Sequence, residues 1–227
     1  MKQPLIEARN IRKYFEGAEK PFELFHDISL TIYPHDTVSC VGRSGEGKTT
    51  LLHIIGGLEP ASQGTISILG KPLAQWPQEE LRNTFFGFIF QSFHLLEDIS
   101  VLDNVLLPVR IARKPTSKNS IYGDRARALI ATVGLEHRIE TKAKWLSGGE
   151  KQRVAIARAL VMDPHIIFAD EPTGNLDSIT AAPVVDLLFH TVSLENKALF
   201  LVTHQEDLAT RCTHQHLLRQ GTLELLG

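Results

Sequence analysis

The sequence predicts an α/β protein whose mixed, mainly parallel sheet is interrupted by a lobe of helices. Three observations lead to this prediction. A strand, a glycine-rich loop and a helix follow one another between residues 36 and 58. The short apolar runs "HIIFAD" and "ALFLVTH" have the length and composition of central parallel strands. Strand signals are lacking between Ser92 and Met162, where helical periodicity takes their place.

The first strands are expected close to the start of the chain. The stretches "PLIEARNIRKYF" (4–15) and "FELFHDISLTIY" (22–33) are rich in β-branched and aromatic residues that partly alternate with polar ones. The stretch "GTISILGKPL" (64–73) has the pattern of a hairpin. Together these segments predict an antiparallel β-subdomain at the edge of the fold.

The core begins with the strand "DTVSCVG" (36–42), a short apolar run that ends in glycine. The segment "KTTLLHIIGGL" (48–58) is apolar at helical spacing, and Gly56-Gly57 is expected to end this helix. A further buried strand is predicted for "FFGFIFQ" (85–91).

The helical lobe follows that strand. Helical periodicity appears in "YGDRARALIATVGL" (122–135) and in "GGEKQRVAIARALVM" (148–162), while "RKPTSKNS" (113–120) is a polar loop. We therefore expect one domain over residues 1–227. Its catalytic core and β-subdomain are expected in 1–91 and 163–227, and its helical lobe in 92–162.

Composition excludes several classes of protein. A hydrophobic content of 43% in 227 residues is enough for a proper core, and the formal net charge of −2 gives no basic excess for nucleic acid. Only two cysteines are present, Cys40 and Cys212, which favours a reducing cytosol. The first residues lack the apolar segment of a signal peptide, and no apolar run approaches the roughly 18 residues of a membrane helix. Any role at a membrane is therefore expected to depend on a partner.

The loop "GRSGEGKTT" matches the phosphate-binding pattern Gly42-x4-Gly47-Lys48-Thr49. Its glycines let successive backbone N–H groups converge on phosphate oxygens, and the helix that follows adds its positive end. Lys48 supplies a cation for the β- and γ-phosphates of ATP, and the Thr49 hydroxyl a ligand for Mg²⁺. By chance the pattern arises in roughly one chain of this length in a hundred, so an ordinary turn is the weaker explanation. The predicted nucleotide contacts of the loop are Gly42, Ser44, Gly45, Glu46, Gly47, Lys48, Thr49 and Thr50.

Two acids end the strand "IIFADE" (166–171). At this position Asp170 can hold Mg²⁺ through water, and Glu171 can polarise an attacking water. The alternative, a solvated loop that happens to be acidic, becomes minor when a phosphate loop is present in the same chain.

A serine and two glycines open the second long helix in "LSGGEKQR" (146–153), which is either an anion-binding helix N-terminus or a flexible hinge. The order of the phosphate loop, "LSGGE", "DEPTGNLD" and "TH" decides between them. This order resembles that of the nucleotide-binding subunits of ABC transporters and extends over nearly the whole chain. The resemblance implies an ABC ATPase fold with a P-loop NTPase core.

The resemblance also implies roles for single residues. Tyr14 would stack on adenine, although a surface tyrosine on a strand is the plain alternative. Gln91 would contact Mg²⁺ and sense the membrane partner, and His204 would hold the γ-phosphate and the attacking water. Asp170 would be the Mg²⁺-linked acid and Glu171 the catalytic base.

The signature implies a partner as well. Ser147, Gly148 and Gly149 would bind the γ-phosphate of an ATP held by a second copy of the chain, and Asp177 would cross the interface. Two ATP molecules would then be buried between two chains, and hydrolysis would loosen the dimer.

Within the family, "FGFIFQSFHLLEDISVLDNVLLPV" and "ADEPTGNLDS" resemble the LolD/MacB-type branch, and "RARALIATVGLEHR" is most similar to the LolD ATPase of lipoprotein-releasing systems. This implies integral membrane permease subunits with a periplasmic domain, and a place on the cytoplasmic face of the bacterial inner membrane. The alternatives are a MacB-type efflux ATPase, an FtsE-like cell-division ATPase and, as a different class, a soluble non-transport ABC ATPase. The last is disfavoured because it usually carries two cassettes or a long coiled-coil insert.

Several residues depart from the family pattern. Asp36-Thr37 replaces the usual Gly-Glu turn, the stretch before the signature lacks proline, and Gln205 and Glu97 stand where aspartate and proline are usual. The largest departure is Glu46, an acid inside an anion-binding loop. We expect its carboxylate to face away from the phosphates, to stay solvated and screened, and to weaken ATP binding modestly.

Overall fold

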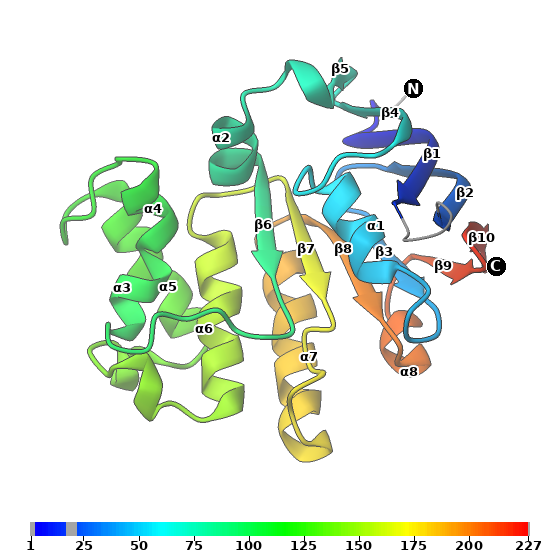
Figure 1. Ribbon diagram of the computed structural model, residues 1–227. Coiled ribbons are helices and arrows are strands. Elements are labelled where there is room, and N and C mark those ends of the chain that lie inside the picture. Colours follow the sequence, from blue (N-terminus) through cyan, green and yellow to red (C-terminus); the bar gives the residue numbers. More distant parts are fainter. Residues whose placement is uncertain (1–2, 17–21, 227) are drawn as a thin grey trace. The chain divides into compact units, whose positions relative to one another are not determined.

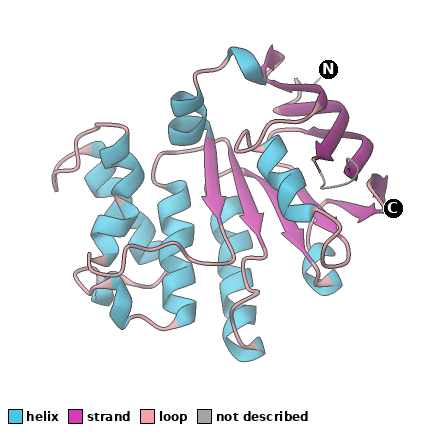
Figure 2. Cartoon of the chain, viewed as in Figure 1, coloured by secondary structure: helices cyan, strands magenta, loops and turns pink. Residues whose placement is uncertain are grey.

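The computed structural model describes residues 3–16 and 22–226 of the chain (Figure 1). The chain divides into two compact units. The first holds the residues up to Gln78 and those from Ala198 onwards, and the second holds Glu79–Lys197. Strands dominate the first unit and helices the second (Figure 2).

The first unit contains an antiparallel sheet with the strand order β2-β1-β4-β5. Ile6 of β1 and Ile28 of β2 are fully buried, whereas Arg9 and Asn10 of β1 are exposed. The antiparallel β-subdomain expected from alternation is thereby confirmed. Its strands are β1 (Ile6–Phe15), β2 (Phe22–Ile32), β4 (Gln63–Ile68) and β5 (Lys71–Pro72).

The same unit contains parallel strands that carry the phosphate loop. Strand β3 (Thr37–Val41) is parallel both to β8 (Ala198–Thr203) and to β9 (His214–Arg219). Strand β8 is buried along its whole length, as expected of a central strand. β9 forms an antiparallel hairpin with β10 (Thr222–Leu225), which the sequence patterns did not indicate. The helical segments of this unit are α1 (Lys48–Ile55), η1 (Leu73–Gln75) and α8 (Glu206–Ala209).

The turn before β3 shows how the Asp36 departure is accommodated. The Asp36 carboxylate accepts a hydrogen bond from the Tyr33 N–H at 2.9 Å, and the Asp36 N–H donates to the Tyr33 carbonyl at 3.2 Å. An aspartate that bonds its own turn in this way is a common turn-former. The substitution therefore keeps a tight entry into β3.

The second unit packs helices around two parallel strands, β6 (Phe86–Ile89) and β7 (Ile166–Asp170). The rings of Phe88 and Phe168 stack across these strands with centroids 5.3 Å apart. The other elements are α2 (Gln78–Glu80, at the boundary), η2 (Leu81–Phe85), α3 (Val101–Val105), α4 (Leu107–Ile111), α5 (Ile121–Thr132), η3 (Glu136–Arg138), η4 (Ala143–Trp145), α6 (Gly148–Leu160) and α7 (Ser178–Leu194).

The helices expected from periodicity at 122–135 and 148–162 correspond to α5 and α6. The compact second unit, Glu79–Lys197, contains β6, β7 and α7 as well as the helices of the expected lobe. The boundaries 92–162 of a separate helical lobe therefore stay a prediction. Within residues 3–16 and 22–226, no helix has both the length and the apolar character needed to cross a membrane.

Candidate functional site

The glycine-rich loop joins the end of β3 to the start of α1. Gly45 and Gly47 have φ values of 86° and 94°, in the left-handed region that strains other residues. Gly42 lies so close to β9 that a Cβ on it would approach the Leu218 carbonyl oxygen to 2.5 Å. The fold itself therefore requires glycine at these three positions.

Lys48 is buried, with only 8% of its surface exposed. Its Nζ donates to the carbonyl oxygens of Gly42 and Arg43 at 3.0 and 3.1 Å, so the ammonium lies inside the loop. Helix α1 begins at Lys48 with Gly47 as its N-cap, and no side chain caps its first N–H groups. A buried cation with neutral partners, next to uncapped N–H groups, suits an anionic phosphate. The Thr49 hydroxyl, in the first turn of α1, is of the type that ligates Mg²⁺.

The Glu46 carboxylate turns toward the hairpin at the end of the chain. Its Oε2 accepts a hydrogen bond from the Gln220 N–H at 2.8 Å. The carboxylate is thus directed toward the turn, and this hydrogen bond is exposed. That the carboxylate stays solvated and faces away from bound phosphate remains a prediction. Glu46 is half-buried because the β9–β10 turn lies against it.

His204 and the phosphate loop share a hollow in the first unit. His204 directly follows β8, whose parallel pairing with β3 brings the ends of both strands to the same edge. A cavity of about 440 Å³ is lined by His204, by Gly42, Arg43 and Glu46 of the loop, and by Gln220. A histidine beside the phosphate loop can donate to a phosphate oxygen.

Tyr14 lies near the end of β1 and is half-buried. Its hydroxyl accepts a weak hydrogen bond from Arg12 Nη1 at 3.4 Å, and its backbone N–H donates to Ser62 Oγ at 3.0 Å. Ser62 thus holds the backbone of Tyr14, and its stacking on adenine stays a prediction.

The acidic pair ends β7 in the second unit. Asp170 is buried, with 8% of its surface exposed. Glu171 has a φ of 44°, and its carbonyl accepts a hydrogen bond from the Gly174 N–H at 2.9 Å. A left-handed conformation in a residue other than glycine stores backbone strain, which is characteristic of functional sites. A tight turn from Glu171 to Gly174 thus follows β7 directly.

Gln91, just beyond β6, is bound to the loop that follows β7. Its Nε2 donates to Asn175 Oδ1 at 3.4 Å, and Asn175 Nδ2 donates to the Gln91 carbonyl at 3.0 Å. A Cβ on Gly174 would lie 2.8 Å from Gln91 Nε2. Asn175 is a residue that the sequence analysis missed, although it stands inside the quoted stretch "DEPTGNLD".

Ser147 caps α6 through a complete capping box. Its Oγ accepts from the Glu150 N–H at 3.3 Å, and Glu150 Oε2 accepts from the Ser147 N–H at 2.8 Å. Burial raises the pKa of Glu150, but the hydrogen bonds from Ser147 and the charge of Arg138 outweigh it and hold the pKa below its ordinary value. This box orders the start of the helix and excludes the flexible hinge considered for this segment.

The two signature glycines lie against the segment that begins α7. A Cβ on Gly149 would lie 2.5 Å from Thr180 Cγ2, and one on Gly148 would lie 3.1 Å from Leu176 Cδ2. The close approach leaves no room for a side chain at Gly149. The signature and the "GNLD" loop are therefore packed together in one unit.

Asp177 is the N-cap of α7. Its Oδ1 accepts hydrogen bonds from the N–H groups of Ile179 and Thr180 at 3.1 and 3.0 Å, and its Oδ2 accepts from Thr180 Oγ1 at 2.7 Å. These bonds hold the pKa of Asp177 below its ordinary value, the Thr180 side chain most strongly. The sequence analysis gave Asp177 a role at an interface and missed this capping role.

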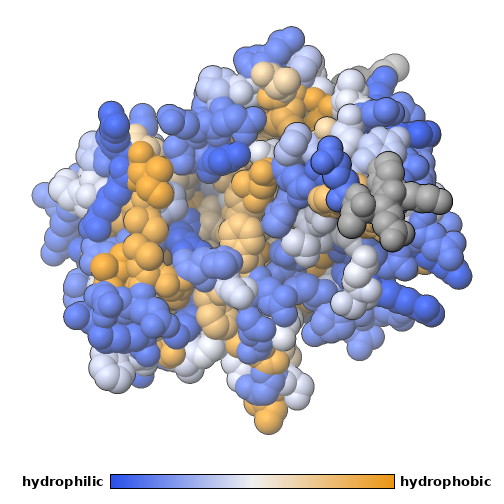
Figure 3. Space-filling model, viewed as in Figure 1, coloured by the Kyte–Doolittle hydropathy of each residue, from blue (hydrophilic) through white to orange (hydrophobic). Residues whose placement is uncertain are grey.

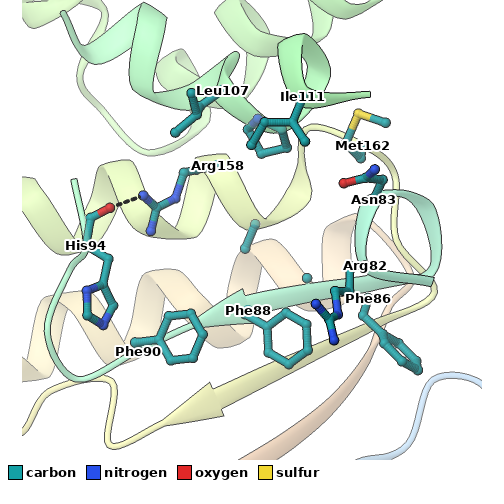
Figure 4. A pocket seen from close by; sticks show the side chains of 13 residues that line it. Arg82, Asn83, Phe86, Phe88, Phe90, His94, Leu107, Ile111, Arg158 and Met162 are labelled. Atoms are coloured by element: carbon teal, nitrogen blue, oxygen red, sulfur yellow. Dashed lines mark hydrogen bonds between the residues drawn. The ribbon is translucent and has the colours of Figure 1, made fainter. Parts of the chain in front are cut away.

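A groove of about 290 Å³ lies on the second unit, and Phe90, the residue before Gln91, is part of its lining (Figure 4). Its floor is aromatic: the rings of Phe88 and Phe90 stack with centroids 5.8 Å apart. Ile111 of α4 borders it with 63% of its surface exposed, and apolar side chains show over α4 and β6 in Figure 3. Arg158 fixes the adjoining backbone by donating to the carbonyls of Phe93 and His94. The groove is thus an apolar surface on a rigid frame.

Comparison with known proteins identifies relatives of the whole chain. A family model described as "ABC transporter" matches residues 25–174. The lipoprotein-releasing system ATP-binding protein LolD of Protochlamydia amoebophila (strain UWE25) is 45% identical over 219 residues, 96% of each chain. LolD 2 of Rhodospirillum rubrum is 43% identical over 227 residues, 98% of this chain and 97% of the relative. Among solved structures, the dimeric post-hydrolysis state of the ATP-binding cassette MJ0796, bound to ADP and Pi, is similar with a TM-score of 0.83 and 33% identity, covering 98% of this chain and 99% of the other.

Proposed function

This chain belongs to the ABC transporter family of ATPases, and we propose that it is the ATP-binding and ATP-hydrolysing subunit of a bacterial inner-membrane transporter that releases lipoproteins. The observation that carries the proposal is the match to two LolD proteins, at 45% and 43% identity, over nearly the whole of this chain and of each relative. The MacB-type and FtsE-like alternatives are consequently less well supported.

The phosphate loop supplies the nucleotide site of this proposal. Its backbone N–H groups and Lys48 would bind the phosphates, and Tyr14 would stack on adenine. Within the described ranges, no group of three or more His, Cys, Asp or Glu side chains forms a metal-ligand set. Mg²⁺ bound mainly by phosphate and water needs no such cluster. Thr49, Gln91 and Asp170 are the side chains that would hold it.

Four side chains of the chain would serve hydrolysis. Glu171, whose backbone has a φ of 44°, would accept a proton from the attacking water. His204 would donate to the γ-phosphate, where negative charge develops. Gln91, held by Asn175, would orient water and the metal ligands without being able to take up a proton itself.

A second copy of the chain would complete each site. The start of α6, with Ser147 as its N-cap, would present backbone N–H groups and the Ser147 hydroxyl to the γ-phosphate bound by the other copy. The dimeric state of the MJ0796 cassette supports this arrangement. ATP would then act as part of the interface.

The groove of Figure 4 is the surface that we assign to the membrane partner, a permease subunit with a periplasmic domain. The expected occupant is a short apolar segment on the cytoplasmic side of that subunit, because the groove has an aromatic floor and the exposed Ile111 at its border. Because Phe90 lines the groove and Gln91 follows it in the chain, movement of the partner would reach a residue assigned to Mg²⁺. The subunit would lie peripherally on the cytoplasmic face of the inner membrane.

The experiment begins with co-purification of the chain from detergent-solubilised membranes and identification of the bound membrane subunits. The complex is then reconstituted in liposomes that hold a labelled lipoprotein, with Glu171→Gln as the inactive control. ATP-dependent release by the wild type alone supports the proposal. Partners of an efflux or division system, or an active ATPase without release, would overturn the assignment of the substrate.

The groove has its own matched pair of variants. Ile111→Asp should abolish co-purification, whereas Ile121→Asp, at an exposed position outside the groove, should leave it unchanged. Equal retention of both variants would show that the partner binds elsewhere.

A further inference from the structure

We propose that Glu46 is a positioning residue that holds the phosphate loop against the β9–β10 turn and thereby sets the affinity of the loop for nucleotide. The inference rests on the proposed nucleotide-binding function of the loop. In this proposal the acid in the anion-binding loop favours nucleotide binding, because it holds the loop in place. The β9–β10 hairpin thereby becomes a part of the nucleotide site.

The contact joins residues that are far apart in the sequence. Glu46 Oε2 lies 2.8 Å from the Gln220 backbone nitrogen, across a separation of 174 residues. Gln220 and Gly221 have φ values of 49° and 76°, and they connect the paired residues Arg219 and Thr222. This is a two-residue hairpin turn with positive φ at both positions, whose first N–H has no partner in the strand ladder. The Glu46 carboxylate supplies that partner.

The turn is held from a second side by β2. The His26 N–H donates to the Gly221 carbonyl at 2.8 Å. A Cβ on Gly221 would lie 2.5 Å from His26 Cδ2, so the turn and β2 are in close contact. The position of the turn is therefore fixed independently of Glu46, and the turn can serve as an anchor.

The phosphate loop also touches β2, at the residue next to Glu46. A Cβ on Gly47 would lie 2.8 Å from Leu24 Cδ2 and 2.9 Å from Phe25 Cε1. Loop, turn and β2 thus contact one another in a closed arrangement, and the Glu46–Gln220 bond is its link between loop and turn. Without that bond the loop would keep its contacts with β9 at Gly42 and with β2 at Gly47, but it would lose its link to the turn.

Two consequences for nucleotide follow. A loop that is already in its binding conformation loses less conformational entropy on binding, so the bond should raise affinity. The carboxylate that accepts the Gln220 N–H is also directed at the turn, which limits its repulsion of phosphate. Glu46 is therefore expected to favour nucleotide binding, in contrast to the weakening predicted from its charge alone.

Glu46→Ala and Glu46→Gln separate the bond from the charge. Alanine removes both, whereas glutamine keeps an oxygen that can accept the Gln220 N–H and removes only the charge. We expect Glu46→Ala to weaken Mg·ADP binding about 3- to 10-fold, an effect of the size that preorganisation of a binding loop can give, and Glu46→Gln to stay within about twofold of the wild type. If charge repulsion were the main effect of Glu46, both variants would bind more tightly, and this outcome would overturn the proposal.

The test uses calorimetric titration of the full-length chain with Mg·ADP, and hydrogen exchange at the Gln220 amide as a second measurement that needs no nucleotide. Exchange should become faster in Glu46→Ala and stay slow in Glu46→Gln. Gln220→Asn keeps the backbone N–H and suits a positive φ, so it should match the wild type in both measurements. Unchanged exchange in Glu46→Ala would refute the bond itself.

Lys48→Ala distinguishes failure of this inference from failure of the proposed function. A wild type that binds Mg·ADP, a Lys48→Ala variant that does not, and a Glu46→Ala variant equal to the wild type would overturn only the role of Glu46. Wild type and Lys48→Ala both lacking affinity would overturn the nucleotide site as well.

Discussion

Gln91 and Asn175 hold each other through two hydrogen bonds, side chain to side chain at 3.4 Å and side chain to carbonyl at 3.0 Å. The pair joins the segment after β6 to the segment after β7 within the second unit. Gln91 follows Phe90, which lines the apolar groove, and Asn175 lies between the acidic pair and Asp177 in the sequence. A displacement of either segment must therefore move the other segment or break these hydrogen bonds.

The pair predicts that Asn175→Ala impairs hydrolysis more than binding. Alanine removes both hydrogen bonds and frees Gln91 from its orientation, while the phosphate loop is unaltered. We expect kcat to fall about 10-fold, typical of a lost orienting contact, and the affinity for Mg·ADP to change less than about twofold. Asn175→Asp keeps the Oδ1 acceptor and loses the Nδ2 donor, so its kcat should lie between that of the wild type and that of Asn175→Ala. Equal kcat values for wild type and Asn175→Ala, from steady-state ATPase assays, would refute an orienting role.

Gly149 offers a direct test of the packing between the signature and α7. Gly149→Ala would place a Cβ 2.5 Å from Thr180 Cγ2, and overpacking of this kind costs about 1–3 kcal/mol. Thr180→Ser removes that methyl group and keeps the hydroxyl that bonds Asp177. In a double-mutant cycle followed by thermal unfolding, the pair Gly149→Ala/Thr180→Ser should recover most of the lost stability. Strict additivity of the two changes would contradict the contact.

Sequence patterns predicted the parts of this protein that depend on neighbours in the chain. The strand, loop and helix around Lys48 follow from local periodicity and glycine placement, and the fold confirms them. The short strand β9 is polar, "HQHLLR", and α7 contains Pro183 and little helical periodicity, so both escaped prediction. Their formation depends on tertiary pairing.

The same limit applies to the site. The type and order of residues such as Lys48, Glu171 and His204 indicate chemistry without a structure. The bonds Glu46–Gln220 and Gln91–Asn175 join residues 174 and 84 positions apart, and no local pattern encodes them. Glu97 is a similar case, since its carboxylate lies 3.5 Å from Lys151 Nζ on the signature helix. An exposed pair of this kind contributes at most about 1 kcal/mol.

The capping box of α6 predicts a pH-dependent contribution to stability. The pKa of Glu150 is lower in the folded chain than its ordinary value of 4.5, so its carboxylate stabilises the fold at pH values above 4.5. That contribution is lost as the pH falls through the folded pKa. Glu150→Gln keeps an acceptor for the Ser147 N–H but loses the charge, and it should unfold about 0.5–1 kcal/mol more easily near neutral pH. The difference in unfolding free energy between the wild type and Glu150→Gln should vanish on acidification. If it grew instead, the pKa of Glu150 would be raised in the folded chain and not lowered.

Lys48 is expected to dominate the binding of nucleotide. Lys48→Ala removes the buried ammonium that lies inside the loop, and with it the closest fixed cation for the phosphates. Affinity should fall at least about 100-fold, or roughly 2.7 kcal/mol. Lys48→Arg keeps the charge but has a planar head group that fits the loop poorly, so it should recover little. Near-normal equilibrium binding by Lys48→Ala would remove the phosphate-loop assignment.

Glu171→Gln should trap the dimer that ATP holds together. The variant retains the size of the side chain and loses the base, so hydrolysis should stop while ATP still binds. Because ligand that binds only the closed state stabilises it by mass action, the closed dimer should accumulate in sedimentation experiments with Mg·ATP. A Glu171→Gln variant that stays monomeric at high concentration, while the wild type turns over normally, would mean that another residue is the base.

Ser147→Arg should act on the opposite side of the same interface, where it would crowd the nucleotide of the second copy. It also removes the cap of α6, so Ser147→Ala is needed as the matched control that loses the cap without adding bulk. Loss of a cap costs about 1 kcal/mol of stability. If crowding is the cause, dimerisation and hydrolysis should fall together in Ser147→Arg and stay closer to normal in Ser147→Ala. Equal losses in both variants would assign the effect to the helix cap.

The Glu171→Gln variant has a third possible outcome. Full inhibition with normal ATP binding but no dimer would show that the membrane subunits must bring the two chains together.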